Sequence, residues 1–242
     1  MNSEERPVHR LFATTRWSVI RQAGDLVSPA ADHAREQLCR LYWPALYAWL
    51  RRDGHSPADA EDLVQGFLAQ FIDRNDFASA QTERGRFRSY LLSSLRNYVI
   101  SARRHDDAAK RGGGNAHVPL EELRVEELAG AGATPDLTAQ QAFDRRWLGA
   151  LLAEALRRLE VDYAAAGQGD RFAALKPWLV ADPPDGAYEP LAEKLGVART
   201  TIATWVSRLR VRYRELVHEQ IRDTVSSQEE FEQELRDLLG VL

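Results

Sequence analysis

Hydrophobic residues recur along this chain at the three- and four-residue spacing of amphipathic helices, and no stretch alternates convincingly in the manner of a strand. Pro44 falls inside the first helical stretch, and we expect it to kink that helix or split it in two. The predicted helical stretches are residues 35–54, 55–74, 87–104, 138–160, 172–179, 188–216 and 226–242. The pattern predicts an all-α protein.

Local signals indicate where the second of these helices begins. Ser56 is a predicted N-cap, Pro57 suits the first helical position, and Asp59 lies near the positive end of the helix dipole. Gly54, just before them, stands where a C-terminal cap of the first helix is expected. Two separate helices are therefore predicted on either side of residue 55.

The helical pattern is interrupted between residues 105 and 138. This segment contains three consecutive glycines, whose backbone entropy opposes any regular element, and an acidic run with one short helix expected over residues 120–128. We therefore predict two small helical domains joined by a flexible linker. The predicted boundaries are an N-terminal extension at 1–10, a first domain at 11–104, the linker at 105–138, a second domain at 139–225 and an acidic amphipathic helix at 226–242.

The last helix, residues 226–242, should carry Phe231, Leu235, Leu238 and Leu239 on one face. It could pack back onto the protein or bind a partner, and the sequence does not choose between these roles.

A tight glycine turn joins two helices in the second domain. A short helix carries Leu191, Ala192 and Leu195, and Gly196 ends it because glycine reaches left-handed dihedrals at little cost. The next helix should begin near Arg199 or Thr200, with Ile202, Val206 and Leu209 facing inward. This is the pattern of a helix-turn-helix, whose second helix enters the major groove of DNA.

The predicted DNA-facing residues lie on and beyond the exposed face of this second helix. Hydroxyl and guanidinium groups there can read base edges, and arginines further along suit phosphates. Trp205 is expected to belong to the core. The candidates are Arg199, Thr200, Thr201, Thr204, Ser207, Arg208, Arg210 and Arg212.

The charge distribution strengthens the case for a polyanionic partner. The formal net charge is −4, yet residues 84–111 contain eight basic residues against two acidic ones, and residues 199–214 contain five arginines and no acid. An acidic run at 121–127 separates the two basic segments. One such run is usually a solvated helix face, whereas two separated basic segments indicate nucleic-acid binding.

Composition and motifs argue against several other classes of protein. With Cys39 as its single cysteine and no secretory signal or membrane-length apolar stretch, the chain is expected in the cytoplasm and away from membranes. The six histidines form no HExxH pair, and there is neither a GxSxG motif nor a phosphate-binding glycine loop. We therefore expect no enzymatic activity, no metal and no cofactor.

Two stretches of the first domain resemble a known family. "SPADAEDLVQGFLAQF" followed by "GRFRSYLLSSLRNYVISARR" is similar to the second conserved region of bacterial RNA polymerase sigma factors of the extracytoplasmic-function (ECF) group in the sigma-70 family. The helix-turn-helix near the other end resembles the fourth region of the same proteins, in the same order. "FATTRWSVI", "GRFRSYLL" and "KRGGG" resemble a subgroup of them.

The resemblance implies a sigma factor that binds core RNA polymerase and directs promoter-specific initiation by recognising and opening promoter DNA. It implies that Asp59, Asp62 and Gln65 dock on a coiled coil of the largest catalytic subunit, with the flap of the second subunit as a further contact. An anti-sigma factor would be a further partner, and the sequence does not decide whether one exists.

The resemblance also assigns the two DNA contacts. The helix-turn-helix would read the minus-thirty-five element, and Asn97 aligns with an asparagine of the loop that captures a flipped base in the minus-ten element. The residues that it implies for the minus-ten element are Arg88, Arg96, Asn97, Arg103 and Arg104.

The chain departs from the family in the second helix of the helix-turn-helix. Ala203 and Trp205 stand where many members carry basic residues, which leaves Arg199, Thr204, Ser207 and Arg208 as the main candidates for base reading. The alternative interpretation is a stand-alone helix-turn-helix regulator with a helical sensing or dimerisation domain. A protein adaptor that uses the acidic tail is a third, but it would leave the basic helix unexplained.

Overall fold

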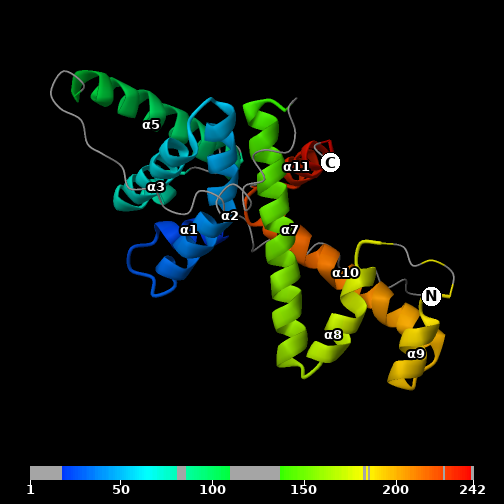
Figure 1. Ribbon diagram of the computed structural model, residues 1–242. Helices are drawn as coiled ribbons and strands as arrows, with labels where there is room; N and C mark the ends of the chain where they lie inside the picture. Colours follow the sequence, from blue (N-terminus) through cyan, green and yellow to red (C-terminus); the bar gives the residue numbers. More distant parts are fainter. Residues whose placement is uncertain are drawn as a thin grey trace, which may run out of the picture. The chain divides into compact units, whose positions relative to one another are not determined.

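The computed structural model describes residues 18–80, 86–109, 137–181, 184, 186–225 and 227–240. Every regular element among these residues is a helix, so the predicted all-α class is confirmed (Figure 1). The described residues form two compact units, one comprising 1–150 and 221–242 and the other 151–220. Two long helices, α7 (Ala139–Ala165) and α10 (Arg199–Arg222), contribute residues to both units.

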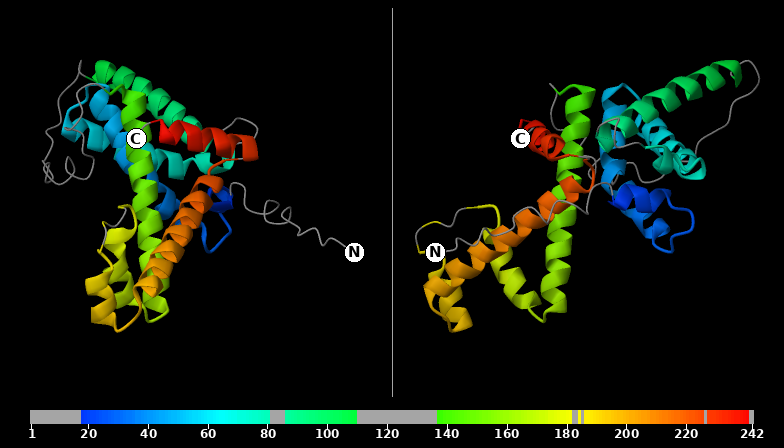
Figure 2. Two further views of the ribbon diagram at one scale, coloured as in Figure 1. Left: turned by 90° about the vertical axis from the view of Figure 1, so that its right-hand side faces the viewer. Right: turned by 180° about the vertical axis from the view of Figure 1, so that it is seen from behind.

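The first unit is built mainly from five helices of the N-terminal half. They are α1 (Ser18–Gly24), α2 (Ala31–Arg52), α3 (Pro57–Asp73), α4 (Asp76–Ser79) and α5 (Phe87–Ala109). The unit also contains α11 (Gln228–Leu239), which Figure 2 draws in red beside the first turns of α7. The C-terminal segment of the chain therefore belongs to the same unit as the N-terminal helices.

Aromatic side chains fill the centre of this first unit. Tyr42, Phe71, Phe87 and Trp147 are almost completely buried. The ring centroids of Tyr42 and Phe87 lie 5.4 Å apart and those of Tyr42 and Trp147 6.0 Å apart, within the range of favourable ring contacts. These contacts join α2 both to α5 and to the start of α7.

The local start of α3 is as predicted. Ser56 is its N-cap and accepts a hydrogen bond from the Asp59 backbone N–H at 3.1 Å, and Pro57 occupies the first helical turn. Pro44 does not split α2, which continues from Ala31 to Arg52. Burial of Ala45 and Leu46, which follow the proline directly, stabilises the helix despite the hydrogen bond that proline cannot donate.

Two other helices differ from their predicted form. The α5 helix continues to Ala109, five residues beyond the predicted end at 104, because no glycine or proline interrupts it before residue 112. In α11 the buried residues are Phe231, Glu234 and Leu238, whereas Leu239 is 63% exposed. The buried side of α11 therefore includes a glutamate beside the predicted apolar residues. The short helix expected over 120–128 lies outside the described residues.

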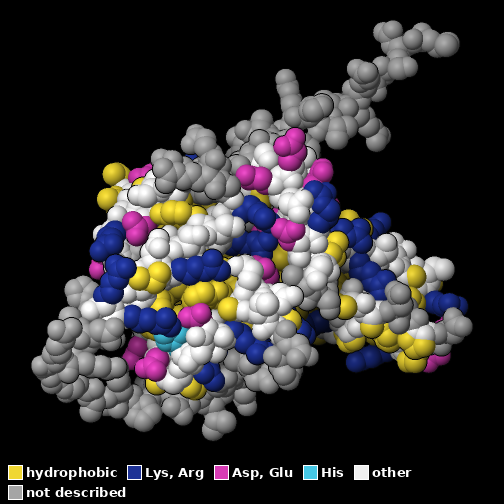
Figure 3. Space-filling model, turned by 90° about the horizontal axis from the view of Figure 1, so that it is seen from above, with side chains coloured by type: hydrophobic (Ala, Val, Ile, Leu, Met, Phe, Trp, Pro, Cys, Tyr) yellow, Lys and Arg dark blue, Asp and Glu magenta, His cyan; other side chains and the backbone are white. Residues whose placement is uncertain are grey.

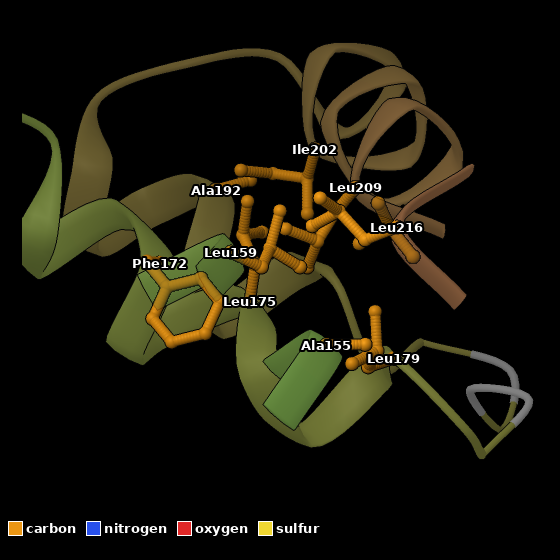
Figure 4. Packing of buried hydrophobic residues seen from close by; sticks show 10 residues of the cluster. Ala155, Leu159, Phe172, Leu175, Leu179, Ala192, Ile202, Leu209 and Leu216 are labelled. Atoms are coloured by element: carbon orange, nitrogen blue, oxygen red, sulfur yellow. The ribbon is translucent and has the colours of Figure 1, made fainter. Parts of the chain in front are cut away.

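The second unit is a small helical domain with its own core. It contains α8 (Gly169–Leu175), the 3-10 turn η3 (Lys176–Trp178) and α9 (Glu189–Leu195), together with parts of α7 and α10. Figure 4 shows leucine, isoleucine, alanine and phenylalanine side chains from these elements converging on one cluster. The cluster residues are Ala155, Leu159, Phe172, Leu175, Leu179, Ala192, Ile202, Val206, Leu209 and Leu216.

The helix-turn-helix geometry of the second unit agrees with the sequence pattern. Gly196 ends α9 in the left-handed conformation, with φ of 63°, and α10 begins at Arg199. Ile202, Val206 and Leu209 are buried as predicted, whereas Leu195 is 38% exposed. No helix in the described part of the chain is long and apolar enough to cross a membrane.

Candidate nucleic-acid interface

One side of α3 is polar and exposed, and the other side is buried in the core of the first unit. Ala60, Val64, Phe67 and Phe71 face the core, and the opposite side exposes Asp59, Asp62 and Gln65, the three residues predicted to dock on core polymerase. Gln65 donates a hydrogen bond from its amide to Glu61 Oε1 at 3.1 Å, and Asp59 is held by Ser56. The i, i+3, i+6 spacing thus brings the three predicted docking residues together on one accessible face.

The outer surface of α5 carries the predicted minus-ten residues other than Arg88. Arg96, Asn97, Arg103 and Arg104 are all exposed. The Arg96 guanidinium lies 5.4 Å from the ring centroid of Trp49, and Arg103 pairs with Asp53 at 3.2 Å. Exposed ion pairs contribute little to stability, so the Arg103 guanidinium can exchange its partner for a phosphate at small cost.

A pocket of about 560 Å³ opens beside Asn97. Aromatic rings from α3 and α5 form part of its wall, and amide, hydroxyl, guanidinium and carboxylate groups form the rest. Aromatic rings beside hydrogen-bonding groups can stack on a planar ring and bind its polar edge. The lining residues are Phe67, Gln70, Phe71, Arg74, Asp76, Ser94, Asn97, Tyr98, Ser101 and Ala102.

Gly66 controls the position of one wall of this pocket, a role that sequence reasoning missed. A Cβ atom at residue 66 would lie closer to the Tyr98 hydroxyl oxygen than any normal contact allows. The absence of a side chain on α3 therefore lets Tyr98 of α5 pack close, with its ring centroid 5.8 Å from that of Phe67. A glycine is unfavourable in the interior of a helix, so its presence in the predicted helix 55–74 was the signal that could have indicated a close contact.

Arg88 differs from its predicted role. Only 6% of the residue is exposed, and its guanidinium pairs with Asp144 of α7 and with Glu234 of α11. Its ring neighbour is Trp147, whose centroid lies 5.4 Å from Arg88 Cζ. In this structure DNA has no access to Arg88, so the residue is not part of the exposed cationic surface.

The face of α10 next to the glycine turn is accessible. Arg199, Thr200, Thr204, Ser207 and Arg208 are exposed, and Thr201 is half-buried. The Thr204 hydroxyl donates a hydrogen bond to the Thr200 carbonyl at 2.8 Å, and Arg199 pairs with Glu189 at 3.4 Å. The candidate base-reading residues of the sequence analysis therefore share one surface of one helix.

Further along α10, Arg210 and Arg212 bind the protein itself. Arg210 donates from Nε to the Trp178 carbonyl at 3.0 Å and from a terminal nitrogen to the Ala181 carbonyl at 2.6 Å. Arg212 lies 3.2 Å from Asp162 and 3.5 Å from both Glu215 and Glu219. Both guanidinium groups would exchange these partners before they could bind a phosphate.

Trp205 packs against the core cluster of the second unit, as predicted. The guanidinium of Arg171 lies 4.2 Å from the centroid of its ring, in the geometry of a cation–π contact. Sequence reasoning did not identify Arg171, because the contact joins α8 to α10, and η3 and α9 lie between these two helices in the chain. Trp205 is therefore a support for α10 rather than a free stacking surface.

Across the face in Figure 3, acidic side chains lie among the basic ones rather than apart from them. Among the described residues no group of three or more His, Cys, Asp or Glu side chains is arranged to hold a metal ion. Cys39 is half-buried, and burial raises the pKa of its thiol.

The comparisons with known proteins bear on the first unit. A family model of sigma-70 region 2 matches residues 38–109, which extend from α2 to the end of α5. Neither the curated proteins nor the solved structures contain a match. The matched residues include the exposed side of α3, the pocket beside Asn97 and the exposed arginines of α5. Residues 38–109 therefore form a sigma-70 region 2 domain, which supports a place for this chain in the sigma-70 family.

Proposed function

We propose that this protein is a sigma factor of the ECF group, which binds core RNA polymerase and directs initiation at specific promoters. The observation that carries the proposal is the arrangement of the matched region. It combines an exposed carboxylate-bearing face on α3 with a pocket beside Asn97 and exposed arginines on α5. One domain thus has a surface for a protein partner and a surface for opened DNA.

In this proposal, the α3 face formed by Asp59, Asp62 and Gln65 docks on the coiled coil of the largest polymerase subunit. The pocket beside Asn97 receives one base flipped from the minus-ten element, and Arg96, Arg103 and Arg104 hold the phosphates of the opened strand. Flipping costs a few kcal/mol, so a binding pocket and backbone clamps are both needed. Arg88 is left out of this set because it is buried.

The helix-turn-helix of the second unit is proposed to read the minus-thirty-five element. Arg199, Thr200, Thr201, Thr204, Ser207 and Arg208 are its base-side candidates. Arg210 and Arg212 have a structural role first, since both bind groups of their own unit. The flap of the second polymerase subunit and an anti-sigma factor are proposed as further partners, and RNA polymerase as partner implies a cytoplasmic protein.

The alternative is a stand-alone helix-turn-helix regulator with a sensing or dimerisation domain. It has less support, because the N-terminal domain matches a polymerase-binding region rather than a sensor. The two interpretations differ in one measurable respect: a sigma factor is required for initiation by core polymerase, whereas a regulator only modulates it.

The deciding experiment is run-off transcription with purified core polymerase on a promoter library, with and without this protein. We expect transcripts only when the protein is present, and weaker co-purification with core polymerase for Asp62→Ala. Asp73→Ala is a matched control, because Asp73 is an exposed carboxylate at the other end of α3. No transcript from any template, together with no comigration with core polymerase, would refute the proposal.

A second experiment tests the helix-turn-helix. Arg208→Ala should reduce discrimination between minus-thirty-five variants by about 1–3 kcal/mol, the usual contribution of a base-reading arginine. Arg157→Ala, which removes an exposed arginine from α7 in the same unit, is the control. An unchanged ranking of promoter variants would remove Arg208 from the base-reading set.

A further inference from the structure

The C-terminal helix α11 covers the first turn of α5. Phe231, Glu234 and Leu238 are its buried residues, and Glu234 retains only 1% exposure. The segment that leads into α11 takes part as well, because the Thr224 carbonyl accepts a hydrogen bond from the Phe87 backbone N–H at 3.4 Å. The start of α5 is thereby enclosed by residues that follow it by more than a hundred positions.

Carboxylates of α11 form ion pairs with two arginines at the start of α5, Arg86 and Arg88. Arg86 donates to Glu234 Oε2 at 2.6 Å and also pairs with Asp237. Arg88 Nε lies 2.7 Å from Glu234 Oε1, and its terminal nitrogen lies 3.5 Å from Asp237 Oδ2. Asp144 of α7 pairs with Arg88 from the other side. All five groups belong to the first unit.

This cluster contains more negative than positive charge. Three carboxylates surround two guanidinium groups, and burial raises the pKa of both Glu234 and Asp144 despite the arginines nearby. Burial thus offsets part of what these ion pairs contribute to the attachment of α11, because charged groups lose hydration when they are buried.

The enclosed arginines have the chemistry of a phosphate site. They lie at the positive end of the α5 dipole, and the first turn of α5 contains no acidic residue of its own. Guanidinium groups bind phosphate and carboxylate oxygens with the same geometry. Arg88 lies on the same helix as Arg96, Arg103 and Arg104, the exposed arginines assigned to opened DNA in the proposed function, and Arg86 directly precedes that helix.

We propose that α11 is an internal competitor of DNA, which holds Arg86 and Arg88 through Glu234 and Asp237 until the helix is displaced. Displacement of α11 releases Arg86, whose two carboxylate partners both lie on α11, and leaves Arg88 with Asp144 alone, so that Arg86 first and Arg88 after exchange of Asp144 bind phosphates of the opened strand. This inference rests on the proposed function, because it assigns the same helix to the same ligand. It gives α11 a regulatory role in addition to a structural one.

The test measures binding of the full-length chain to a fluorescent single-stranded oligonucleotide of mixed sequence, by anisotropy at low salt. The releasing variant is Glu234→Gln with Asp237→Asn, and the matched control is Glu229→Gln with Glu232→Gln, which removes the same charge from exposed positions of α11. A docked state favoured about ten to one weakens apparent affinity about tenfold. We therefore expect the releasing variant to bind about tenfold more tightly than the wild type and the control to bind as the wild type does, or at most slightly more tightly.

A third variant tests whether the gain comes from the uncovered arginines. Adding Arg86→Gln to the releasing variant should abolish most of its gain, whereas Arg103→Gln should weaken binding in every background. Equal affinity of the wild type and the releasing variant, with the Arg103→Gln effect intact, would overturn the role of α11 and leave the proposed function standing. If no variant binds the oligonucleotide, the proposed function and this inference both fail.

Far-UV circular dichroism of each variant checks that it is folded. The Asp237→Asn single variant, which is altered only at a partly exposed side chain, repeats the test with the smallest perturbation.

Discussion

Replacing Arg88 with methionine removes the guanidinium that joins α5 to α7 and α11 while it keeps most of the side-chain volume. Arg88 is the partner of Asp144, and it shares Glu234 with Arg86. After the replacement, Asp144 loses its guanidinium partner, and Arg86 is left as the partner of Glu234 and Asp237. The variant therefore leaves buried negative charge without compensation.

The exposure of the remaining groups sets the size of the effect. The side chains of Glu234 and Asp144 are only 1% and 15% exposed, so water can replace little of the lost interaction. Removing one partner of such a buried pair costs about 3–5 kcal/mol. With an m value of about 2–3 kcal/mol/M, the urea midpoint should fall by roughly 1–2.5 M.

Glu234→Gln is the matched comparison, because it removes a charge from the same cluster without leaving any guanidinium unpaired. Arg88 keeps Asp144, and Arg86 keeps Asp237. The expected cost is about 1 kcal/mol, the net contribution of one hydrogen bond. The two variants thus separate the effect of a lost charge from that of an unbalanced cluster.

The assay is urea unfolding followed by far-UV circular dichroism and by tryptophan fluorescence, to which Trp147 beside Arg88 contributes as one of six tryptophans. We expect a large shift for Arg88→Met and a small one for Glu234→Gln. Equal shifts for the two variants, or a loss of less than 1 kcal/mol for Arg88→Met, would refute the reasoning from charge balance.

Three further predictions concern the first unit. Ser56→Ala should lower the free energy of unfolding by about 1 kcal/mol, because the Asp59 N–H loses its cap, and urea midpoints measure this directly. Gly66→Ala should cost about 1–3 kcal/mol by overpacking against the Tyr98 hydroxyl, and adding Tyr98→Phe should restore most of that loss; strictly additive costs would contradict the contact. Burial raises the pKa of Glu234 above 4.5, so the folded chain binds this proton more readily than the unfolded chain, and the wild type should gain stability relative to Glu234→Gln as the pH falls from neutrality toward 4.5. Parallel urea titrations over that range check the last prediction, and a constant gap between the two proteins would argue against it.

Features that depend on near neighbours in the chain could be predicted from the sequence. The spacing of apolar residues predicts the helices, Ser56 predicts the start of α3, and Gly196 predicts the turn between α9 and α10. The accessible side of α3 follows in the same way, because a buried stripe on one side of a helix leaves its other side exposed. These features depend on interactions within a few residues.

The predicted domain boundaries remain a prediction. The two compact units of the structure divide the chain at other positions. The first unit includes residues 221–242 as well as the N-terminal helices. No local signal in α11 indicates this, since an amphipathic helix has the same pattern whether it packs on its own chain or on a partner. The site residues assigned through the family resemblance likewise remain proposals.

Two arginines of α5 illustrate what the sequence by itself determined and what only the tertiary structure decided. The sequence determined that Arg88 and Arg96 belong to one basic helix, because helical periodicity is a local property. Only the tertiary structure decided that Arg88 is buried against carboxylates while Arg96 stays exposed, since Asp144 lies 56 residues away in the chain. The contact of Gly66 with Tyr98 was decided in the same way. The physical reason is that a charge or a missing Cβ acts on whatever packs against it, and the packing partner is set by the fold of the whole unit.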